Sequence, residues 1–267
     1  MTNTIANSPG DRPSFLSYPK ENFLRPMWRA VLNWVGQNPM HLQNNQPIIS
    51  FAFDDFPKTA LFEGGRILEE VGARGTFYTA LGLAGAKNSL GDLFQIEDLQ
   101  QLVERGHELA SHTFDHVSAR DVSNANFVVN VQKGHESIEP KTGLVPSANF
   151  AYPFGCTNVR LKIKIGAMMQ SCRGNFSGLN GPITDRNLLR ANALYGGSEA
   201  LEAALKLVEL NNRTNGWLIF YTHDVRSKPS NFGCTPELLE ALVKSAAKQR
   251  CRILTIAEVI SKEGLID

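Results

Sequence analysis

The run PIISFAFDD, residues 47–55, combines apolar and β-branched residues with two adjacent carboxylates at its end. Such a composition favours a buried β-strand, with the aspartates following at its carboxyl end. Short apolar runs of the same kind return at residues 75–82, 107–112, 149–154 and 217–223. The sequence therefore predicts a series of short strands along the chain.

Segments with helical periodicity separate these strands, for example IEDLQQLVERG at residues 96–106 and SEALEAALKLVELNN at residues 198–212. Strand and helix alternating in this way indicate parallel β-α-β units. Seven or eight such units favour closure of the sheet over an open arrangement. The sequence thus predicts an α/β fold, a distorted parallel (β/α) barrel of TIM type with about seven strands.

Polar residues stand at or just beyond the predicted strand ends. In a parallel barrel the carboxyl ends of all strands share one face, where active sites are built. We therefore expect four separate segments to meet in a single pocket: Asp54 with Asp55, His112 with His116, residues 152–155, and His223 with Asp224.

The sextet SHTFDH, residues 111–116, places two imidazoles four residues apart. They can face one ion if the chain turns helically after the strand, and an aspartate from another strand end then completes a set of two histidines and one carboxylate. Such a set leaves coordination positions open for water and substrate. Either motif alone is more often a turn, a helix cap or an unrelated histidine pair, but together on one barrel face they predict metal-assisted hydrolysis.

Length and composition limit the other classes of function. The 267 residues suit one barrel, residues 47–267, preceded by an extension, residues 1–46, with a helix near residues 21–36. A formal net charge of +1, from 27 basic and 26 acidic residues spread along the chain, provides no polybasic stripe, so nucleic acid is not expected as a partner. The sequence has no apolar run long enough for a membrane span and no secretory signal at its start, so we expect a cytoplasmic protein.

Four motifs in order resemble those of the polysaccharide deacetylases of the NodB-homology type, carbohydrate esterase family four. The first, TFDD in the family, is AFDD at residues 52–55, and the second, HxxxH, is His112 to His116. The third, Arg-x-Pro-Tyr-Gly, is AYPFG at residues 151–155, and an apolar strand ending in His-Asp is residues 218–224. The resemblance extends from about Ile48 to Ile256 and implies a NodB-type barrel.

The resemblance also implies roles for single residues. Asp55, His112 and His116 would hold Zn²⁺, or another divalent transition metal such as Co²⁺ or Ni²⁺. Asp54 would accept the proton of the attacking water, and His223 would protonate the departing amine. The other assignments are the Phe154 backbone N–H for the oxyanion, Asp224 as a hydrogen-bonding support, and substrate contacts by Tyr152, Pro153 and the apolar segment that begins at Leu218.

The chain departs from the family pattern at three points. Ala151 stands where the family usually has the arginine that supports the catalytic aspartate; we expect Arg74 to replace it, with Arg190 as second candidate. Phe56 replaces the usual glycine after the aspartate pair. The aspartate that orients the final histidine is not evident, and Asp185 is the candidate for it.

These observations predict a metal-dependent hydrolase that removes N-acetyl groups from amino-sugar units of an oligo- or polysaccharide. A related C–N hydrolase acting on a formamide or cyclic amide is the first alternative, because a fold does not fix a function. A catalytically inactive barrel that binds glycans is the second, and its motive is the missing arginine at Ala151. The sequence does not identify the sugar or the oligomeric state.

Overall fold

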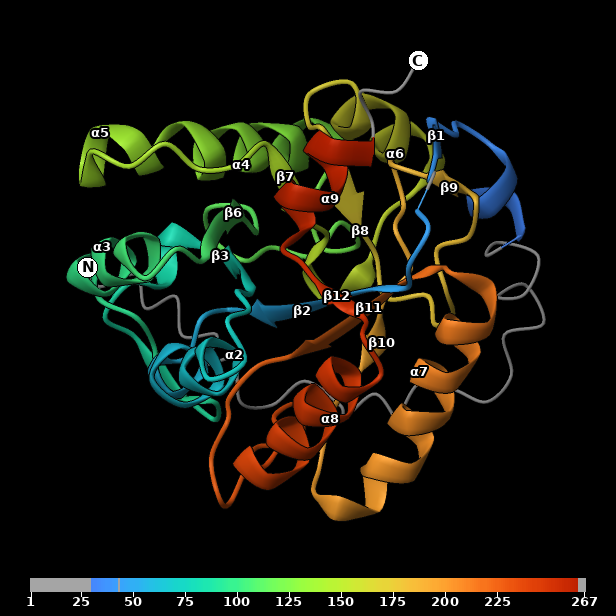
Figure 1. Ribbon diagram of the computed structural model, residues 1–267. Helices are drawn as coiled ribbons and strands as arrows, with labels where there is room; N and C mark the ends of the chain where they lie inside the picture. Colours follow the sequence, from blue (N-terminus) through green and yellow to red (C-terminus); the bar gives the residue numbers. More distant parts are fainter. Residues whose placement is uncertain (1–29, 43, 264–267) are drawn as a thin grey trace.

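The structure of the protein is a computed structural model that describes residues 30–42 and 44–263. Its centre is one parallel sheet that curls into a distorted barrel (Figure 1), as the sequence predicts. In spatial order the strands are β10 (Asn192–Ala193), β11 (Trp217–Thr222), β2 (Ile48–Asp54), β3 (Thr76–Thr79), β6 (Glu108–Ser111), β7 (Asn149–Ala151) and β8 (Ser171–Arg173). A further strand, β12 (Arg252–Ile253), pairs with the first two residues of β2.

An irregular segment, residues 189–193, joins the two edges of this sheet. Leu189 forms a parallel bridge with Arg173 at the end of β8. Its N–H donates to the Cys172 carbonyl at 2.8 Å, and three residues later the chain pairs with β11 as β10. The same short segment therefore contacts both edges, and the barrel closes without a long eighth strand.

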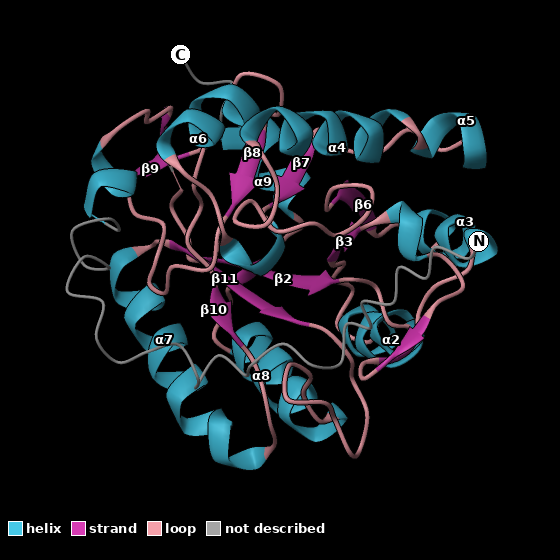
Figure 2. Ribbon diagram, turned by 180° about the vertical axis from the view of Figure 1, so that it is seen from behind, coloured by secondary structure: helices cyan, strands magenta, loops and turns pink. Residues whose placement is uncertain are grey.

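Helices surround the barrel (Figure 2). On one side lie α7 (Leu201–Thr214) and α8 (Pro236–Lys248), and on the opposite side lie α4 (Asn124–Glu136), α5 (Ile138–Thr142) and α6 (Val159–Gly166). The others are α2 (Arg66–Glu69), α3 (Ile96–Glu104), α9 (Ile256–Glu263), the π-helix η3 (Ala60–Gly65), and the 3₁₀ turns η4 (Leu81–Leu83), η5 (Pro153–Gly155) and η6 (Ser198–Ala200). Two short antiparallel pairs complete the fold: β1 (Pro39–His41) with β9 (Ile183–Asp185), and β4 (Lys87–Asn88) with β5 (Gly91–Asp92).

Local sequence determines where several of these helices begin. The side chains of Ser123, Asn158 and Thr235 each accept a hydrogen bond from the backbone N–H three residues on, at the start of α4, α6 and α8. These caps satisfy N–H groups that have no partner inside the helix. Pro236 follows Thr235 at the first position of α8, where its missing N–H costs nothing.

Alternate residues of the strands pack into two different cores. Leu218 and Phe220 of β11 face outward, into the core shared with α7 and α8. Trp217 and Ile219 face inward, into a barrel core with Ala52, Tyr78, Ala110 and Ala151. Apolar residues of α9 complete this inner core, and the Ala257 N–H of α9 donates to Glu108 at the start of β6. The helix α9, which the sequence did not predict, thus covers the amino ends of the strands.

The described part of the N-terminal extension packs on the barrel. Residues 30–34 are helical and residues 35–36 form a bend, while residues 21–29 of the predicted helix lie outside the described residues. The buried ammonium of Lys162 on α6 donates to the carbonyls of Leu32 and Val35 and pairs with Asp185 of β9. Among the helices of residues 30–42 and 44–263, none is both long and apolar enough to cross a membrane.

Candidate active site at the carboxyl ends of the strands

The carboxyl ends of β2, β6 and β11 bring the predicted polar residues together. Asp54 is the last residue of β2, His112 directly follows β6, and His223 directly follows β11. Seven non-glycine residues of the described chain have positive φ, and five lie in the loops of this face: Asp55, Phe56, Thr113, His116 and Phe154. Such conformations cost of order 1–3 kcal/mol each and cluster at functional sites, where the surrounding structure enforces them.

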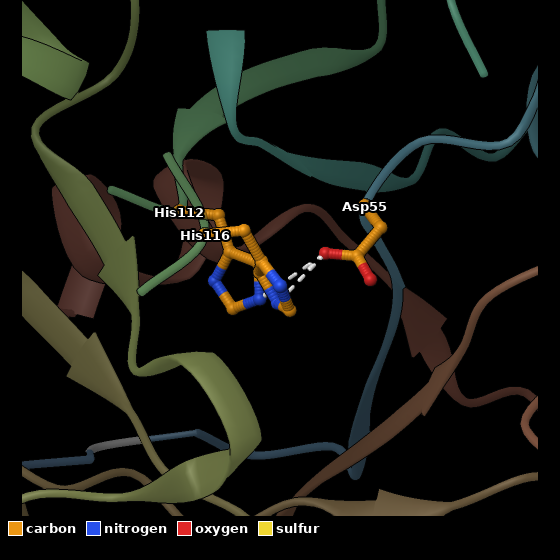
Figure 3. Close-up of side chains that lie close together, drawn as sticks. All are labelled: Asp55, His112 and His116. Atoms are coloured by element: carbon orange, nitrogen blue, oxygen red, sulfur yellow. Dashed lines mark ion pairs between the residues drawn. The ribbon is translucent and has the colours of Figure 1, made fainter. Parts of the chain in front are cut away.

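Asp55, His112 and His116 form a compact cluster (Figure 3), in which the candidate ligand atoms all lie within 4.8 Å of one another. The Asp55 Oδ1 atom is 3.0 Å from His116 Nε2 and 3.7 Å from His112 Nε2. Both imidazoles turn toward the carboxylate. Three side chains of the predicted ligand set thus converge on one point.

The loop between the two histidines is not the helical turn that the sequence suggested. Residues 113–116 form a bend in which Thr113 and His116 take left-handed conformations. Asn130 of α4 holds this bend, because its Oδ1 accepts from the Phe114 N–H at 2.9 Å and the Asp115 N–H at 3.0 Å. Asn130 also donates to the Asp115 carboxylate at 2.7 Å, so Asp115 belongs to the turn and points away from the site.

The hydrogen bond of His112 fixes which ring nitrogen faces the cluster. Its Nδ1 lies 2.7 Å from the Ala151 carbonyl, which can only accept, so Nδ1 carries the hydrogen. The Nε2 lone pair is then directed at Asp55. Burial lowers the pKa of His112 to about 4, even though Asp54 and Asp55 act in the opposite direction. The imidazole is therefore neutral near pH 7, the state that a metal ligand requires.

Asp55 is buried, and its Oδ1 has no hydrogen-bond donor among the described residues. Burial raises the pKa of this carboxyl, although His223 and His112 partly offset the effect. A buried carboxylate oxygen without a donor is unusual and needs an explanation. The oxygen faces the Nε2 atoms of two histidines, one of them a neutral imidazole, and this donor set suits Zn²⁺ or a similar cation.

The adjacent Asp54 has a different partner. Both of its oxygens lie 2.6 Å from Nη2 of Arg173, a guanidinium that is only 2% exposed. The rings of Tyr78 and Tyr221 lie against this guanidinium, each with its centroid 4.9 Å from Cζ. Burial alone would raise the pKa of Asp54, but Arg173 and the nearby imidazoles outweigh it and lower the pKa. Asp54 is therefore ionised at neutral pH.

The two arginines predicted to support Asp54 lie elsewhere, so that prediction is wrong. Arg74 precedes β3 at the opposite end of the barrel, where it donates to the carbonyls of Arg105 at 2.5 Å and Ala73 at 2.8 Å. Arg190 donates to the Ser177 carbonyl at 3.1 Å. Arg173 was missed from the sequence, although it directly follows the apolar run AMMQSC, residues 167–172, as the other site residues follow theirs.

His223 faces the same cluster from β11. Its Nε2 is 3.9 Å from Asp55 Oδ2, and its Nδ1 is 3.0 Å from the Phe232 carbonyl. A backbone carbonyl therefore orients this ring, and the prediction that Asp185 does so is wrong. Asp185 instead pairs with Lys162 and accepts from the Asn38 N–H at 2.9 Å.

Asp224 supports His223 through the loop that follows β11. Its carboxylate is buried, accepts from the Ser230 N–H at 2.8 Å and the Ser230 hydroxyl at 2.5 Å, and pairs with Arg226 at 2.7 Å. The Ser230 hydroxyl in turn accepts from the Phe232 N–H at 3.1 Å. Asp224 thus holds the segment whose Phe232 carbonyl orients the histidine, and it does not contact the imidazole itself through any of these bonds.

The side chains predicted by name to contact the substrate are not accessible. Tyr152 and Pro153 are buried, and Leu218 faces outward into the helix-side core, so these three side chains cannot touch a substrate in this conformation. The exposed aromatic ring at this face is Phe154, whose centroid lies 4.7 Å from that of His116. The role of the Phe154 N–H for an oxyanion stays a prediction.

Phe56, which stands where the family usually has a glycine, lies in the core and not in the site. Its side chain is fully buried and packs against Phe77 and Phe94, with ring centroids at 5.1 and 5.3 Å. Its φ of 47° is one that glycine adopts without strain. The aromatic ring thus belongs to the core that also contains Leu218 and Phe220, while the backbone has a positive φ directly after Asp55.

The chain is similar to known proteins in sequence and in fold. The family model "Polysaccharide deacetylase" matches residues 41–168. No curated protein sequence matches the chain. Among solved structures, the chain is similar to the Xyl-CE4 domain of a multidomain xylanase from the hindgut metagenome of Trinervitermes trinervoides, at 20% identity and a TM-score of 0.57, over 82% of this chain and 92% of that one.

Two further structures are similar. The catalytic domain of peptidoglycan N-acetylglucosamine deacetylase from Eubacterium rectale shares 15% identity at a TM-score of 0.54, over 82% of this chain and 93% of that one. A mutant CE4-family pseudoenzyme with restored enzymatic activity shares 14% identity at a TM-score of 0.51, over 81% and 68%. At these identities the likeness establishes the fold, the distorted barrel of the NodB type.

Proposed function

Because the chain belongs to the polysaccharide deacetylase family of the NodB-homology type, we propose that it removes N-acetyl groups from amino-sugar units of an oligo- or polysaccharide, with a divalent metal ion held by Asp55, His112 and His116. The observation that carries the proposal is the orphaned Oδ1 of Asp55, which faces the Nε2 atoms of two histidines beside an ionised Asp54. Every group needed for amide hydrolysis then lies on one face of the barrel.

Three protein ligands leave positions open for water and substrate. When bound, a zinc ion supplies Lewis-acid polarisation of the substrate carbonyl and lowers the pKa of water from 15.7 toward about 7. The three ligands come from two separate strand ends, β2 and β6. Their geometry is fixed by the Ala151 carbonyl behind His112 and by the bend that Asn130 holds.

Asp54 acts as the general base in this proposal. Its lowered pKa keeps it ionised, and Arg173 binds both oxygens, so the carboxylate has a defined orientation beside the cluster. A base so placed accepts the proton of the attacking water and contributes on the order of 10² to 10⁴ in rate. Its neighbour Asp55 has the ligand role because its Oδ1 accepts no hydrogen bond from the described residues and faces the Nε2 atoms of His112 and His116.

His223 acts as the general acid. The Phe232 carbonyl accepts from Nδ1, which leaves Nε2 directed toward the cluster. In the protonated ring, Nε2 delivers its proton to the departing amine of the sugar. The backbone N–H of Phe154, in the turn η5, is the proposed donor to the oxyanion.

The hypothesis of an inactive glycan-binding barrel loses the observation that supported it. It depended on the absence of an arginine at Ala151, and a guanidinium is nevertheless bound to Asp54. No observation in the described residues favours a formamide or cyclic amide over an acetylated amino sugar. The hydrolytic reading of an N-acetylated carbohydrate is therefore retained alone.

The test is acetate release from N-acetylated chito-oligosaccharides by metal-stripped protein and by protein reconstituted with zinc or cobalt. Asp54→Asn is compared with Asp92→Asn, a matched change at an exposed carboxylate that pairs with Lys87 on the β4–β5 hairpin. We expect metal-dependent release that Asp54→Asn abolishes and Asp92→Asn retains. Stoichiometric metal binding without release from any N-acetylated sugar would reject the proposed substrate class.

A further inference from the structure

Ala151 and Arg173 are direct neighbours across two strands. Ala151 ends β7, Arg173 ends β8, and the two residues are paired in the parallel register. Side chains paired in this way point to the same face of a sheet. Ala151 packs in the inner core of the barrel, and the Arg173 guanidinium likewise reaches inward, to Asp54. The arginine therefore lies one strand away from position 151, at the same level of the barrel.

The surroundings of Arg173 contact its guanidinium on several sides, although its Nε has no hydrogen-bond partner among the described residues. Its Nη2 binds both oxygens of Asp54, and its Nη1 donates to the Gly174 carbonyl at 3.0 Å. The rings of Tyr78 and Tyr221 flank it, each at 4.9 Å. A buried charge that loses its partner is strongly unfavourable, so the pair depends on both members.

Ala151, the residue paired with Arg173, has a small side chain. Its side chain is fully buried in the inner core, which also contains Tyr78, and a longer side chain at this position would point to the same face of the sheet as Arg173. The small residue on β7 therefore goes together with the arginine on β8 that binds Asp54. The backbone of Ala151 has a separate use, because its carbonyl accepts from His112.

We propose that Arg173 is the positioning residue of Asp54, and that it performs from β8 the task that the family resemblance assigns to position 151 on β7. The inference rests on the proposed function, since it gives Asp54 its orientation as the base. One nitrogen of Arg173, Nη2, lies 2.6 Å from both carboxylate oxygens, so it fixes the position of the carboxylate group. A misplacement of about 1 Å at such a group can cost about 10²-fold in rate.

The first test needs no substrate. Urea unfolding of the full chain, with and without added zinc, is compared for Asp54→Asn, Arg173→Met and the double variant. Each single variant leaves one buried charge without its partner, and the double variant removes both. We expect the unfolding midpoint of the double variant to be no lower than that of either single variant. Two additive losses would show that the pair is not coupled and would overturn the inference.

The second test moves the arginine. Arg173→Met is expected to lower kcat by about 10²-fold or more while KM changes less than about threefold, because the base is misplaced and the substrate contacts remain. The double variant Ala151→Arg with Arg173→Met returns the guanidinium to β7 and should recover at least about tenfold of the lost kcat. A matched double variant, Ala151→Met with Arg173→Met, adds similar volume without charge and should not recover it.

Folding and function can be separated in these tests. If the relocated arginine prevents folding, seen as a lost unfolding transition, added guanidinium ion with Arg173→Ala takes its place and should restore part of kcat. Equal kcat for Arg173→Met and the wild type, or no recovery from either source of guanidinium, would overturn the positioning role. If the wild type releases acetate from no substrate, the proposed function fails and takes the kinetic half of the inference with it, whereas the unfolding comparison still decides whether Arg173 fixes Asp54.

Discussion

Each end of the barrel buries an acidic side chain, but the two side chains differ in how many hydrogen bonds their carboxylates accept. At the amino end, Glu108 accepts hydrogen bonds at both oxygens: from Ser147 and Asn149 at one, and from Thr76 and the Ala257 N–H of α9 at the other. At the carboxyl end, Asp55 Oδ1 has no donor among the described residues.

This difference in hydrogen bonding separates a carboxylate that stabilises the fold, Glu108, from one that is available to bind a ligand, Asp55. A fully satisfied carboxylate joins β3, β6, β7 and α9 and thereby stabilises the closed end of the barrel. A buried oxygen without a donor costs free energy unless a cation or substrate is bound to it. The histidines follow the same division: His107 at the amino end uses both ring nitrogens, with Gly75 and Glu69, while the Nε2 of His112 points into the cluster.

The largest effect is expected from Asp55→Asn. Loss of this ligand should lower deacetylase activity by about 10³-fold or more, because the metal contributes several kcal/mol to the transition state. The free energy of unfolding of the metal-free chain should not fall, since no hydrogen bond to Oδ1 is lost. Acetate release and urea unfolding of the stripped protein measure the two quantities; a large loss of stability would give Asp55 a structural role.

Glu108→Gln should behave in the opposite way. The amide places a donor where four donors already point, so we expect a loss of about 3 kcal/mol in the free energy of unfolding. Zinc affinity and KM should remain unchanged at temperatures where the variant is folded. Urea unfolding and a zinc titration test this, and weakened zinc binding by folded Glu108→Gln would show that the two ends are not independent.

His112, at the carboxyl end of the barrel, should make the free energy of unfolding depend on pH. Burial lowers the pKa of the folded state to about 4, whereas an unfolded histidine titrates near 6.5. Between these values the unfolded chain binds the additional proton, so the free energy of unfolding falls as the pH decreases from about 6.5 toward 4, by up to about 1.4 kcal/mol per pH unit.

The comparison that isolates this contribution is urea unfolding of metal-free wild type and His112→Asn between pH 7 and pH 5. Asn retains a donor for the Ala151 carbonyl but does not titrate in this range. We expect a shallower decline for the variant. Parallel curves for the two proteins would contradict the account of His112 as a buried neutral ring.

The smallest effect is expected at the loop after β11. Ser230→Ala removes the hydroxyl that links Asp224 to the Phe232 N–H, so the Phe232 carbonyl that orients His223 loses part of its support. We expect about 1 kcal/mol of lost stability and a decrease in kcat of severalfold with little change in KM. Ser227→Ala, an exposed serine of the same loop, is the control and should behave as the wild type.

The sequence was informative wherever a pattern was local. Polar residues at the ends of predicted strands were expected to lie on one face of the barrel, because the carboxyl ends of parallel strands share that face. This reasoning located Asp54, Asp55, His112, His116 and His223. The sequence was less informative where a contact joins distant residues: Arg173 stands at a strand end like the other site residues, but no sequence spacing pairs it with Asp54, 119 positions away. Nor could the outward direction of Leu218 be predicted, since a strand buried on both faces has no alternation.

Two local features were also hidden. The loop from His112 to His116 reads as one helical turn, yet Asn130 of α4 holds it as a bend through contacts 15 or 16 residues away. The helix α9 belongs to the inner core only because its apolar residues find the open amino end of the barrel. In both cases tertiary packing decides between conformations that the local sequence allows.

The most direct test of the central claim is calorimetric titration of metal-free protein with zinc, for the wild type, Asp55→Asn and Glu108→Gln. The account predicts one zinc ion per chain for the wild type and for folded Glu108→Gln, and no stoichiometric binding for Asp55→Asn. Equal binding by the wild type and Asp55→Asn, or no binding by the wild type, would contradict a metal site at the carboxyl ends of the strands.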